Sequence, residues 1–346
     1  MQALVLEDFG RLTISTVDDP IVGSEDVEVR VIATGICGSD VHGFTGENGR
    51  RVRGQVMGHE TVGVVHSIGA DVERSDLALG TLVTVNPVIL PPEDIQTYAG
   101  REQHDPWKRV LGVAPELIAA FAERIVVPAR NVVVLPESMP VLYGALIEPL
   151  AVAVNAVRRV DAGPGDAVIV LGGGPIGQSI VLALQMAGVK KILVTEVMDS
   201  RRALLERLNV IVVDPREESV PDAAERIFGR HADVALDAVG LSETLNDALS
   251  ATRLGGRVCL VGMGSPTLTL DAFRISTAER SIVGSFTYSN DDFRAAAEWM
   301  SGAPAAAAEL ISHSVGMDGA HDAFTGLAAG DGTAGKIMVV LDADRV

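Results

Sequence analysis

The sequence predicts an α/β protein built from a β-rich domain and a domain with a doubly wound, parallel sheet. The length of 346 residues suggests about two domains. About the first 90 residues read as short β-rich segments separated by turn signals. After about residue 150, short apolar runs alternate with helix-like segments, as expected for buried parallel strands joined by helices.

The β-rich part is expected to hold several short strands. Val27–Val31 alternates between apolar and polar residues, and Thr61–Val65 is a β-branched run that contains one glycine. Turn signals separate these strands at Asp19-Pro20, Gly23-Ser24 and Gly69-Ala70. The stretch 87–112 is richer in proline and polar residues, so we expect a long surface loop or lobe there.

The second part of the chain is expected to form the parallel sheet. Its candidate strands are the apolar runs Ala167–Leu171, Ile192–Thr195, Val210–Val213, Val234–Leu236 and Val258–Val261. The alternation ends near Phe286, and an Ala-rich helix at 293–300 and a β-like run at 336–341 follow. We therefore expect residues 1–149 and 287–346 to form the β-rich domain, and residues 150–286 to form the parallel-sheet domain.

Composition excludes several classes of partner. The chain has 28 Lys+Arg and 46 Asp+Glu, a net charge of −18, which argues against nucleic acid and anionic membranes. Two cysteines, Cys37 and Cys259, cannot form a disulfide framework and suit a reducing cytoplasm. The N-terminus lacks the basic start of a signal peptide, and no apolar run approaches the ~20 residues of a membrane span. We expect a cytoplasmic protein.

A glycine loop predicts a dinucleotide site. Gly172-Gly173-Gly174-Pro175-Ile176-Gly177 follows a predicted strand and opens a predicted helix. Gly172 permits a tight turn, Gly174 lets the backbone approach a pyrophosphate, and Gly177 lets helix and strand pack closely. The helix N-terminus offers free N–H groups to phosphates, and Pro175 loses no needed hydrogen bond there. This context favours a Rossmann dinucleotide site over an ordinary glycine turn.

Glu196 lies at the end of the second strand of this part. An acidic residue there can accept hydrogen bonds from both hydroxyls of an adenosine ribose, and it would repel a 2′-phosphate. We therefore expect NAD rather than NADP. Arg201 and Arg202 follow shortly after and are cations that could favour the phosphate, so they count against this preference.

Four residues offer ligands for a metal ion. Cys37, His59, Glu60 and Glu148 supply a thiolate, an imidazole and two carboxylates, all of which bind zinc. Three protein ligands with one open position define a catalytic zinc site. Taken singly, each residue has an ordinary structural interpretation, such as a small buried cysteine or a hydrogen-bonded histidine.

The wider set of motifs resembles the zinc-dependent medium-chain dehydrogenases. The segments that carry the resemblance, in order, are Gly35–His42, Gly58–Val65, Ala145–Ala151, the glycine loop, Gly255–Val258, Gly284–Phe286 and Gly335-Lys336. Cys-Gly-Ser-Asp-Val-His and Ile-Glu-Pro-Leu-Ala are most similar to the polyol (sorbitol) dehydrogenase branch. The resemblance implies a GroES-like catalytic domain split around a Rossmann NAD-binding domain. It also implies reversible oxidation of a secondary alcohol or polyol to a ketone by hydride transfer.

By this resemblance Cys37 and His59 are zinc ligands, and Glu60 and Glu148 match positions that ligate zinc or hold its water. Zinc with one thiolate, a neutral histidine and one carboxylate is electrically neutral. A second carboxylate makes the site anionic and weakens its Lewis acidity. We therefore expect Glu60 and Glu148 not to ligate together in the reactive state, and which of them is the third ligand stays open.

The resemblance assigns a proton relay to Ser39 and His42 and makes Asp40 a hydrogen-bond partner of a zinc ligand. It extends the NAD contacts to further positions. These are Ile176, Arg201, Val261, Gly262, Met263, Phe286, Thr287 and Tyr288.

The chain also departs from the family pattern. The stretch 87–112 has no cysteine, so we expect one zinc per chain and no structural zinc, and what stabilises the lobe stays open. Gly43 and Thr287 replace an aromatic residue and an arginine of the polyol branch, which predicts a larger, less polar pocket. The exact substrate and the preferred direction are open.

Several alternatives remain beside this interpretation. The sequence does not distinguish oxidation of a secondary alcohol or polyol from threonine or butanediol dehydrogenase activity. A zinc-free quinone or enoyl reductase shares the fold, but it normally lacks the ligand set. In a non-enzymatic NAD-binding protein the zinc-ligand set and the proton relay would have no function. Family members are dimers or tetramers, so a homo-oligomer is expected.

Overall fold

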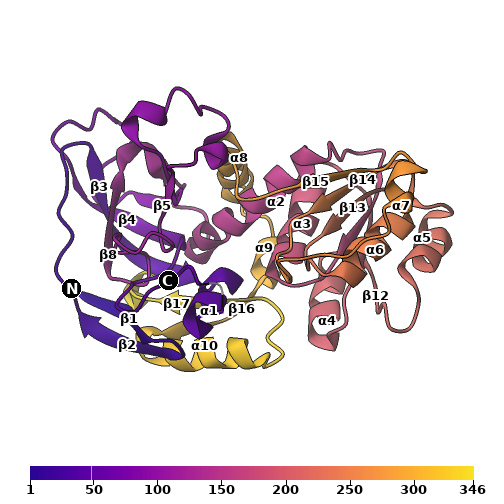
Figure 1. Ribbon diagram of the computed structural model, residues 1–346. Helices are drawn as coiled ribbons and strands as arrows, with labels where there is room; N and C mark the ends of the chain where they lie inside the picture. The colour runs from indigo at the N-terminus through magenta and orange to yellow at the C-terminus, as the bar shows by residue number, and fades with distance from the viewer. Residues whose placement is uncertain (48) are drawn as a thin grey trace. The chain divides into compact units, whose positions relative to one another are not determined.

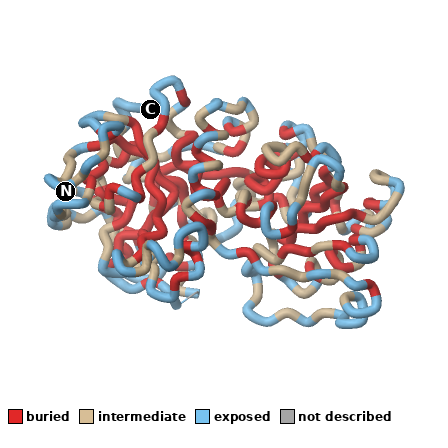
Figure 2. The backbone as a smooth tube through the Cα atoms, turned by 90° about the horizontal axis from the view of Figure 1, so that it is seen from above, coloured by how far each residue is buried: buried red, intermediate tan, exposed pale blue. Residues whose placement is uncertain are grey.

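The structure, a computed structural model, describes residues 1–47 and 49–346, and its chain forms two compact units. The first unit comprises Met1–Glu148 and Ser289–Val346, and the second comprises Pro149–Tyr288 (Figure 1). In each unit the strands form a buried centre, and most exposed residues lie on the surrounding loops and helices (Figure 2). The first unit is therefore built from two separate parts of the sequence.

A seven-stranded sheet forms the centre of the first unit. Its strands run in the order β16-β17-β3-β4-β5-β9, with β8 paired to β3. Their bounds are β3 Asp26–Gly35, β4 Glu60–Ile68, β5 Leu82–Val85, β8 Arg124–Pro128, β9 Val132–Val134, β16 Ile311–Gly316 and β17 Lys336–Val340. A separate hairpin pairs β1 Gln2–Asp8 with β2 Arg11–Thr16. The expected β-rich character of this region is confirmed.

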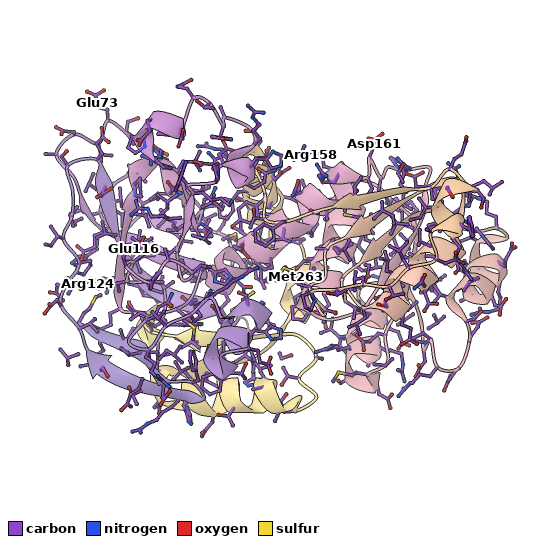
Figure 3. All side chains as sticks on the ribbon, viewed as in Figure 1. Glu73, Glu116, Arg124, Arg158, Asp161 and Met263 are labelled. Carbon is purple, nitrogen blue, oxygen red and sulfur yellow. The ribbon has the colours of Figure 1, made fainter. Side chains whose placement is uncertain are left out.

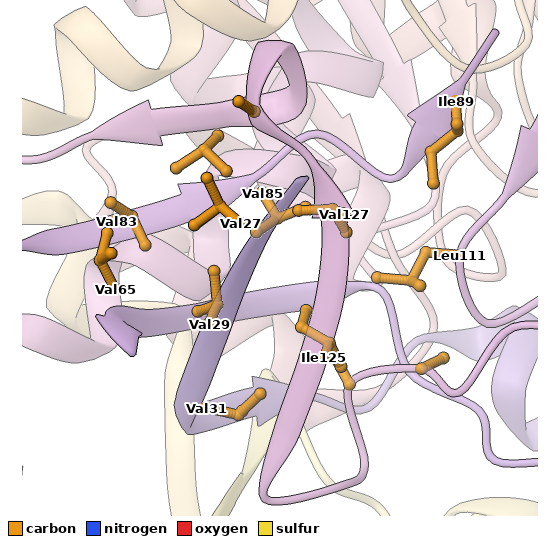
Figure 4. Packing of buried hydrophobic residues seen from close by; sticks show 14 of the residues in the cluster. Val27, Val29, Val31, Val65, Val83, Val85, Ile89, Leu111, Ile125 and Val127 are labelled. Carbon is orange, nitrogen blue, oxygen red and sulfur yellow. The ribbon is translucent and has the colours of Figure 1, made fainter. Parts of the chain in front are cut away.

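Valine and isoleucine side chains from β3, β4, β5 and β8 pack into one core of this unit. Val27, Val29, Val83, Ile125 and Val127 are almost fully buried in it (Figure 4). The strand β3 extends four residues beyond the alternating run that predicted it, because its second half is buried on both faces. Alternation marks a strand with one solvated face, so it disappears where both faces are covered.

The register of three neighbouring strands sets the position of the site described below. β17 and β4 flank β3 and both pair with it antiparallel. Gly35, the last residue of β3, is opposite Met338 of β17 and Glu60 of β4. The start of β17, the end of β3 and the start of β4 therefore lie at the same edge of the sheet.

Helices and short turns complete the first unit. They are α1 Gly38–Thr45, α8 Asn290–Ser301, α9 Ala306–Glu309, α10 Ala320–Ala329, and the 3-10 segments η3 Ala129–Asn131, η4 Val141–Leu146, η5 Met317–Gly319 and η6 Ala343–Arg345. A second apolar core lies between β1, α1 and α10. Phe44 of α1 contacts Phe324 of α10, with ring centroids 5.5 Å apart.

The stretch 87–112 is an ordered lobe with little regular structure, as its composition indicates. It contains β6 Val88–Ile89, η1 Pro92–Asp94, η2 Glu102–His104 and β7 Arg109–Val110. The carboxylate of Glu102, which is only 5% exposed, accepts hydrogen bonds from the backbone N–H groups of Gly100 and Asn290, both 3.0 Å. Asn290 is the first residue of α8, and its side chain also accepts from Asn86 at 2.7 Å. These contacts attach the lobe to the N-terminus of α8.

The second unit is a six-stranded, all-parallel sheet in the order β12-β11-β10-β13-β14-β15. Its strands are β10 Ala167–Leu171, β11 Lys191–Thr195, β12 Ile211–Val213, β13 Ala232–Asp237, β14 Thr252–Leu260 and β15 Ser281–Gly284. Its helices are α2 Ile147–Arg159, α3 Pro175–Met186, α4 Asp199–Arg207, α5 Val220–Phe228, α6 Ser242–Ala251 and α7 Phe273–Ser276, where α2 begins in the first unit. The order reverses at β10, which is the doubly wound Rossmann arrangement. The predicted α/β class is confirmed.

One helical stretch is longer and more apolar than the sequence analysis indicated. Val141–Arg159 spans 19 residues with a mean hydropathy of 1.4, which is sufficient to cross a membrane by length and composition. The stretch includes Glu148 and Asn155, so no unbroken apolar run marks it. Within its most apolar window 72% of the residues are buried inside the protein, as in the core helix of a soluble protein.

Candidate active site

Three potential metal ligands converge at the edge of the first unit's sheet. One ligand atom each of Cys37, His59 and Glu60 lies within 4.8 Å of the others. Cys37 follows the end of β3, and Glu60 is the first residue of β4. The antiparallel pairing of these strands therefore brings together residues that are more than twenty positions apart in the sequence.

The local backbone holds Cys37 at the beginning of a helix. Cys37 is the N-cap of α1 and has extended backbone angles, with φ −86° and ψ 150°. Its N–H donates to Asp40 Oδ2 at 3.3 Å, so the third residue of the helix fixes the turn that carries the thiol. Cys37 is half-buried, whereas Glu60 is fully buried and His59 is 6% exposed.

Asp40 lies beside the histidine. Its Oδ1 atom lies 3.5 Å from His59 Nδ1 and 3.4 Å from Arg51 Nη2, and all three side chains are buried. Burial alone would raise the pKa of Asp40, but the charges of His59 and Arg51 lower it below its ordinary value. A carboxylate that stays charged beside the imidazole can orient it toward a metal.

Lys336 is a buried cation at this site that the sequence analysis left without a role. Its Nζ atom donates to Glu60 Oε1 at 2.7 Å and to the carbonyl oxygen of Ile36 at 3.1 Å. Burial alone would lower the pKa of Lys336, but the negative charges of Glu60, Cys37 and Glu148 raise it. The ammonium group therefore stays charged among anionic neighbours.

Two buried atoms of the cluster have no hydrogen-bond partner. They are His59 Nδ1, for which 3.5 Å to Asp40 is too long for a good hydrogen bond, and Glu60 Oε2. Burial alone would lower the pKa of His59, but Asp40 and the Cys37 thiolate raise it well above its ordinary value. The anionic surroundings and the unpartnered Oε2 atom of Glu60 fit a divalent cation, while Nδ1 of His59 faces Asp40. The thiol, imidazole and carboxylate of the cluster are a ligand set that fits zinc.

Glu148 lies close to the cluster but outside it. It stands in the first turn of α2 and is 8% exposed. Its charge raises the pKa of Lys336, so its carboxylate is close enough to contribute to the local field. The three-residue cluster contains Glu60 and not Glu148.

The predicted relay residues lie on α1. Ser39 is half-buried and stands two positions after Cys37. The side chain of His42 is 61% exposed, and its Nδ1 lies 3.0 Å from Glu47 Oε2. One helix turn therefore leads from the half-buried thiol toward solvent.

The glycine loop of the second unit has the expected strand–turn–helix geometry. Gly172 has a φ of +92°, a left-handed conformation that favours glycine. A Cβ atom at Gly177 would overlap with the carbonyl oxygen of Gly172, so the first turn of α3 lies directly against the turn before it. Gly174 is the N-cap of α3, followed by Pro175 at the first position and then Ile176. A Cβ atom built on Gly174 would lie 3.6 Å from Nη1 of Arg201, so the guanidinium group of Arg201 lies beside the N-terminus of α3.

Glu196 faces the glycine loop. Its Oε2 atom accepts from the N–H of Gly173 and its Oε1 atom from the N–H of Met198, both at 2.8 Å. Arg201 Nη1 lies 3.8 Å from Glu196 Oε2. Arg202 instead donates to Asp214 and to the backbone oxygens of Glu196 and Val197.

Two loops carry the other predicted cofactor residues. Val261 and Gly262 both donate their N–H groups to the carbonyl oxygen of Asp237. Met263, which is labelled in Figure 3, follows them in this loop. The residue is 63% exposed. In the second loop Phe286 is 50% exposed and Tyr288 is almost fully buried.

Thr287, between Phe286 and Tyr288, is strained. Its φ of 50° is rare for a β-branched residue, and its Oγ1 atom is buried without a partner. Its carbonyl oxygen accepts from the side chain of Asn155, which holds the loop in this conformation.

The space beside Gly43 is filled by other side chains. The replacement of an aromatic residue by Gly43 was expected to enlarge the pocket. A Cβ atom at Gly43 would instead overlap with Cγ of Arg51 and lie 3.3 Å from Met57 Sδ. The buried arginine that supports Asp40 fills the space beside Gly43, so this glycine leaves no cavity there.

The sequence analysis missed Lys336, Arg51, Glu47, Asn155 and Glu102. Gly335-Lys336 is one of the motifs that carry the resemblance, but this motif does not indicate that Lys336 is buried beside Glu60. Glu47 and Arg51 lie near their partners His42 and Asp40 in the sequence, but no motif marks them. The partners of Asn155 and Glu102 are set by long-range packing.

Comparisons with known proteins agree with this geometry. Residues 23–137 match the alcohol dehydrogenase GroES-like domain, and residues 175–302 match the zinc-binding dehydrogenase family. A sorbitol dehydrogenase of Arabidopsis thaliana is 35% identical over 78% of this chain and 76% of its own length.

Solved structures show the same fold. The 2R,3R-butanediol dehydrogenase of Bacillus subtilis superposes with a TM-score of 0.88 at 28% identity, covering 98% of this chain and 99% of its own. A zinc-binding dehydrogenase of Sinorhizobium meliloti 1021 bound to NADP has a TM-score of 0.87 at 28% identity and covers 98% and 99%.

Proposed function

Because the chain belongs to the zinc-dependent medium-chain dehydrogenases, in their polyol branch, we propose that it oxidises a secondary alcohol or polyol reversibly to a ketone with NAD. The class of the enzyme, an alcohol or polyol dehydrogenase, follows from its relatives. The observation that carries the site assignment is the convergence of Cys37, His59 and Glu60, with the buried Oε2 atom of Glu60 left without a hydrogen-bond partner.

Cys37, His59 and Glu60 would hold one zinc ion, with Glu148 as the alternative to Glu60 for the third position. When bound, zinc acts as a Lewis acid that makes a substrate hydroxyl more acidic, and NAD accepts the hydride. Asp40 holds His59 in orientation, and the half-buried thiol leaves one side of the cluster accessible. Ser39 and His42 would carry the released proton toward solvent along α1.

The choice of NAD over NADP rests on how the arginines after Glu196 are used. Arg202 is engaged by Asp214 and by backbone oxygens, and Arg216 pairs with the same aspartate. Of these three arginines, Arg201 lies beside the carboxylate of Glu196, which cancels its charge. Arg202 also pairs with Asp199, so the three carboxylates Glu196, Asp199 and Asp214 balance the three arginines. A 2′-phosphate would therefore meet no excess positive charge, although a relative of known structure binds NADP.

The test is a turnover panel with NAD and NADP over polyols, diols, threonine and simple secondary alcohols. We expect the highest kcat/KM with NAD and a secondary alcohol or polyol, and a loss of activity with a strong chelator. The Cys37→Ala variant should bind NAD as wild type does but lose turnover. Activity that survives both treatments would favour a zinc-free quinone or enoyl reductase. Turnover of threonine or of a diol alone would favour the threonine or butanediol alternative.

A separate variant tests the preference for NAD over NADP. Glu196→Ala removes the carboxylate that faces the glycine loop, while Glu206→Ala on α4 removes an exposed carboxylate of the same unit as a control. We expect only the first change to lower kcat/KM for NAD and raise it for NADP. An unchanged ratio would refute the role given to Glu196.

We further propose a cytoplasmic homodimer or homotetramer that has no nucleic-acid or membrane partner, and domain boundaries near residues 149 and 287. The absence of a disulfide framework and the net charge of −18 support the first part. The division into two compact units after Glu148 and after Tyr288 supports the second. Light scattering of the purified protein measures the oligomeric state.

A further inference from the structure

Lys336 and Glu60 form a buried ion pair across a glycine. Lys336 is the first residue of β17, Glu60 is the first residue of β4, and Gly35 ends the strand between them. Their side chains are 4% and 0% exposed, and the two charged atoms lie 2.7 Å apart. A Cβ atom at Gly35 would overlap with Glu60 Oε2 and lie 3.2 Å from Cδ of Lys336. The pair can meet there because the middle strand has no side chain at this point.

The ion pair divides the carboxylate of Glu60 into two unlike halves. Oε1 accepts a hydrogen bond from the ammonium group of Lys336, whereas Oε2 is buried without a hydrogen-bond partner. Glu60 is also the carboxylate that converges with Cys37 and His59. The same ammonium group donates to the carbonyl oxygen of Ile36, the residue before Cys37. One cation thus contacts both segments that carry the candidate metal ligands.

The charge count changes when Lys336 is included. A divalent ion with the thiolate of Cys37, neutral His59 and the carboxylates of Glu60 and Glu148 would leave one net negative charge. The ammonium of Lys336 restores neutrality. The reason to expect that Glu60 and Glu148 exclude each other therefore weakens, because one of the two carboxylates already has a buried counter-ion.

We propose that Lys336 is a positioning residue that competes with the metal for Glu60. It holds Oε1, cancels part of the charge of the carboxylate and limits its donation to the metal, which keeps the metal a stronger Lewis acid. This inference rests on the proposed zinc site. The inference concerns how strongly the carboxylate of Glu60 binds the metal, and not whether the site binds zinc.

The variants are Lys336→Met, which removes the charge at similar length, and Lys336→Arg, which keeps it. Lys191→Met is the matched control, since Lys191 is also the first residue of a strand but is exposed. In Lys336→Met the released carboxylate should bind the metal more strongly. We expect zinc to leave to a chelator about tenfold more slowly and kcat to fall about tenfold or more. Lys336→Arg should restore both values to near wild type.

Cobalt substitution supplies a readout that a purely structural role would not change. Because absorption bands of bound Co²⁺ report its ligands and geometry, Lys336→Met should shift them and Lys336→Arg should not. In the Glu60→Gln background, Lys336→Met should no longer slow zinc release, because the carboxylate under competition is gone. If Lys336→Met does not fold, Lys336→Gln gives the same comparison, since it keeps a donor without charge.

The experiments distinguish a failure of the role proposed for Lys336 from a failure of the proposed zinc site. Faster zinc release in Lys336→Met, unchanged cobalt bands, or an effect of equal size in the Glu60→Gln background would overturn the role of Lys336. A wild-type protein that takes up no zinc would overturn the zinc site, and this inference with it.

Discussion

Replacing Glu102 by glutamine should loosen the lobe 87–112 from helix α8 while leaving the shape of the side chain nearly unchanged. The lobe has no cysteine to hold it, and the buried carboxylate of Glu102 accepts N–H groups from Gly100 and from Asn290 at 3.0 Å each. Glutamine keeps one acceptor oxygen, but its amide nitrogen then faces an N–H group. One hydrogen bond to a charged acceptor is lost, and a buried donor is left without a partner.

The size of the effect follows from these contacts. A hydrogen bond to a charged group contributes about 1.5–3 kcal/mol. A carboxylate at a helix N-terminus adds about 0.3–1 kcal/mol through the helix dipole. The loss is therefore about 2–4 kcal/mol. For a unit of this size it should lower the melting temperature by about 5–15 °C.

Thermal unfolding of the zinc-loaded protein measures this change. Glu93→Gln is the matched control, because Glu93 lies in the same lobe and is exposed. The control should melt within about 1 °C of wild type, as surface substitutions usually do. Equal melting temperatures for Glu102→Gln and Glu93→Gln would refute the idea that this carboxylate holds the lobe.

Two further predictions concern charged groups that the folded protein keeps ionised. Asp40→Asn keeps the size of the side chain that orients His59 but removes its charge, so zinc affinity or kcat should fall about 10–100-fold, as chelator competition and turnover would show. In the second unit, burial alone would raise the pKa of Asp233, but the guanidinium groups of Arg230 and Arg253 lower it. The stability that Asp233 contributes is thus complete at neutral pH and is lost as the pH falls below about 4. The melting temperatures of wild type and Asp233→Asn should converge with acidification, and a constant difference would contradict this.

The sequence predicted the elements whose signal is local. The apolar run Ala167–Leu171 is strand β10 to the residue, and the glycine loop after it begins helix α3 where the pattern placed it. Such runs are informative because a parallel strand is covered on both faces and excludes polar residues. The limits of the strands in the β-rich unit were harder to predict, because β3 loses its alternation where both of its faces are buried.

The contacts that complete the site could not be predicted in the same way. Lys336 meets Glu60 across 276 positions of sequence, and Glu102 meets Asn290 across 188. Nothing in the residues around either partner marks the other. Their proximity is set by which strands and helices become neighbours, and that order appears only once the sheet is assembled.

The Gly43 position shows why a substitution read alone can mislead. A glycine in place of an aromatic residue suggests empty space, but Arg51 lies against Gly43 and its Nη2 reaches Asp40 at 3.4 Å. The glycine is required by the arginine, and the arginine in turn helps to keep Asp40 charged beside His59. A change that looked like a change in the substrate pocket is therefore part of the support for a metal ligand. The expectation of a changed pocket therefore rests on Thr287 alone, where the backbone is strained and a buried hydroxyl has no partner.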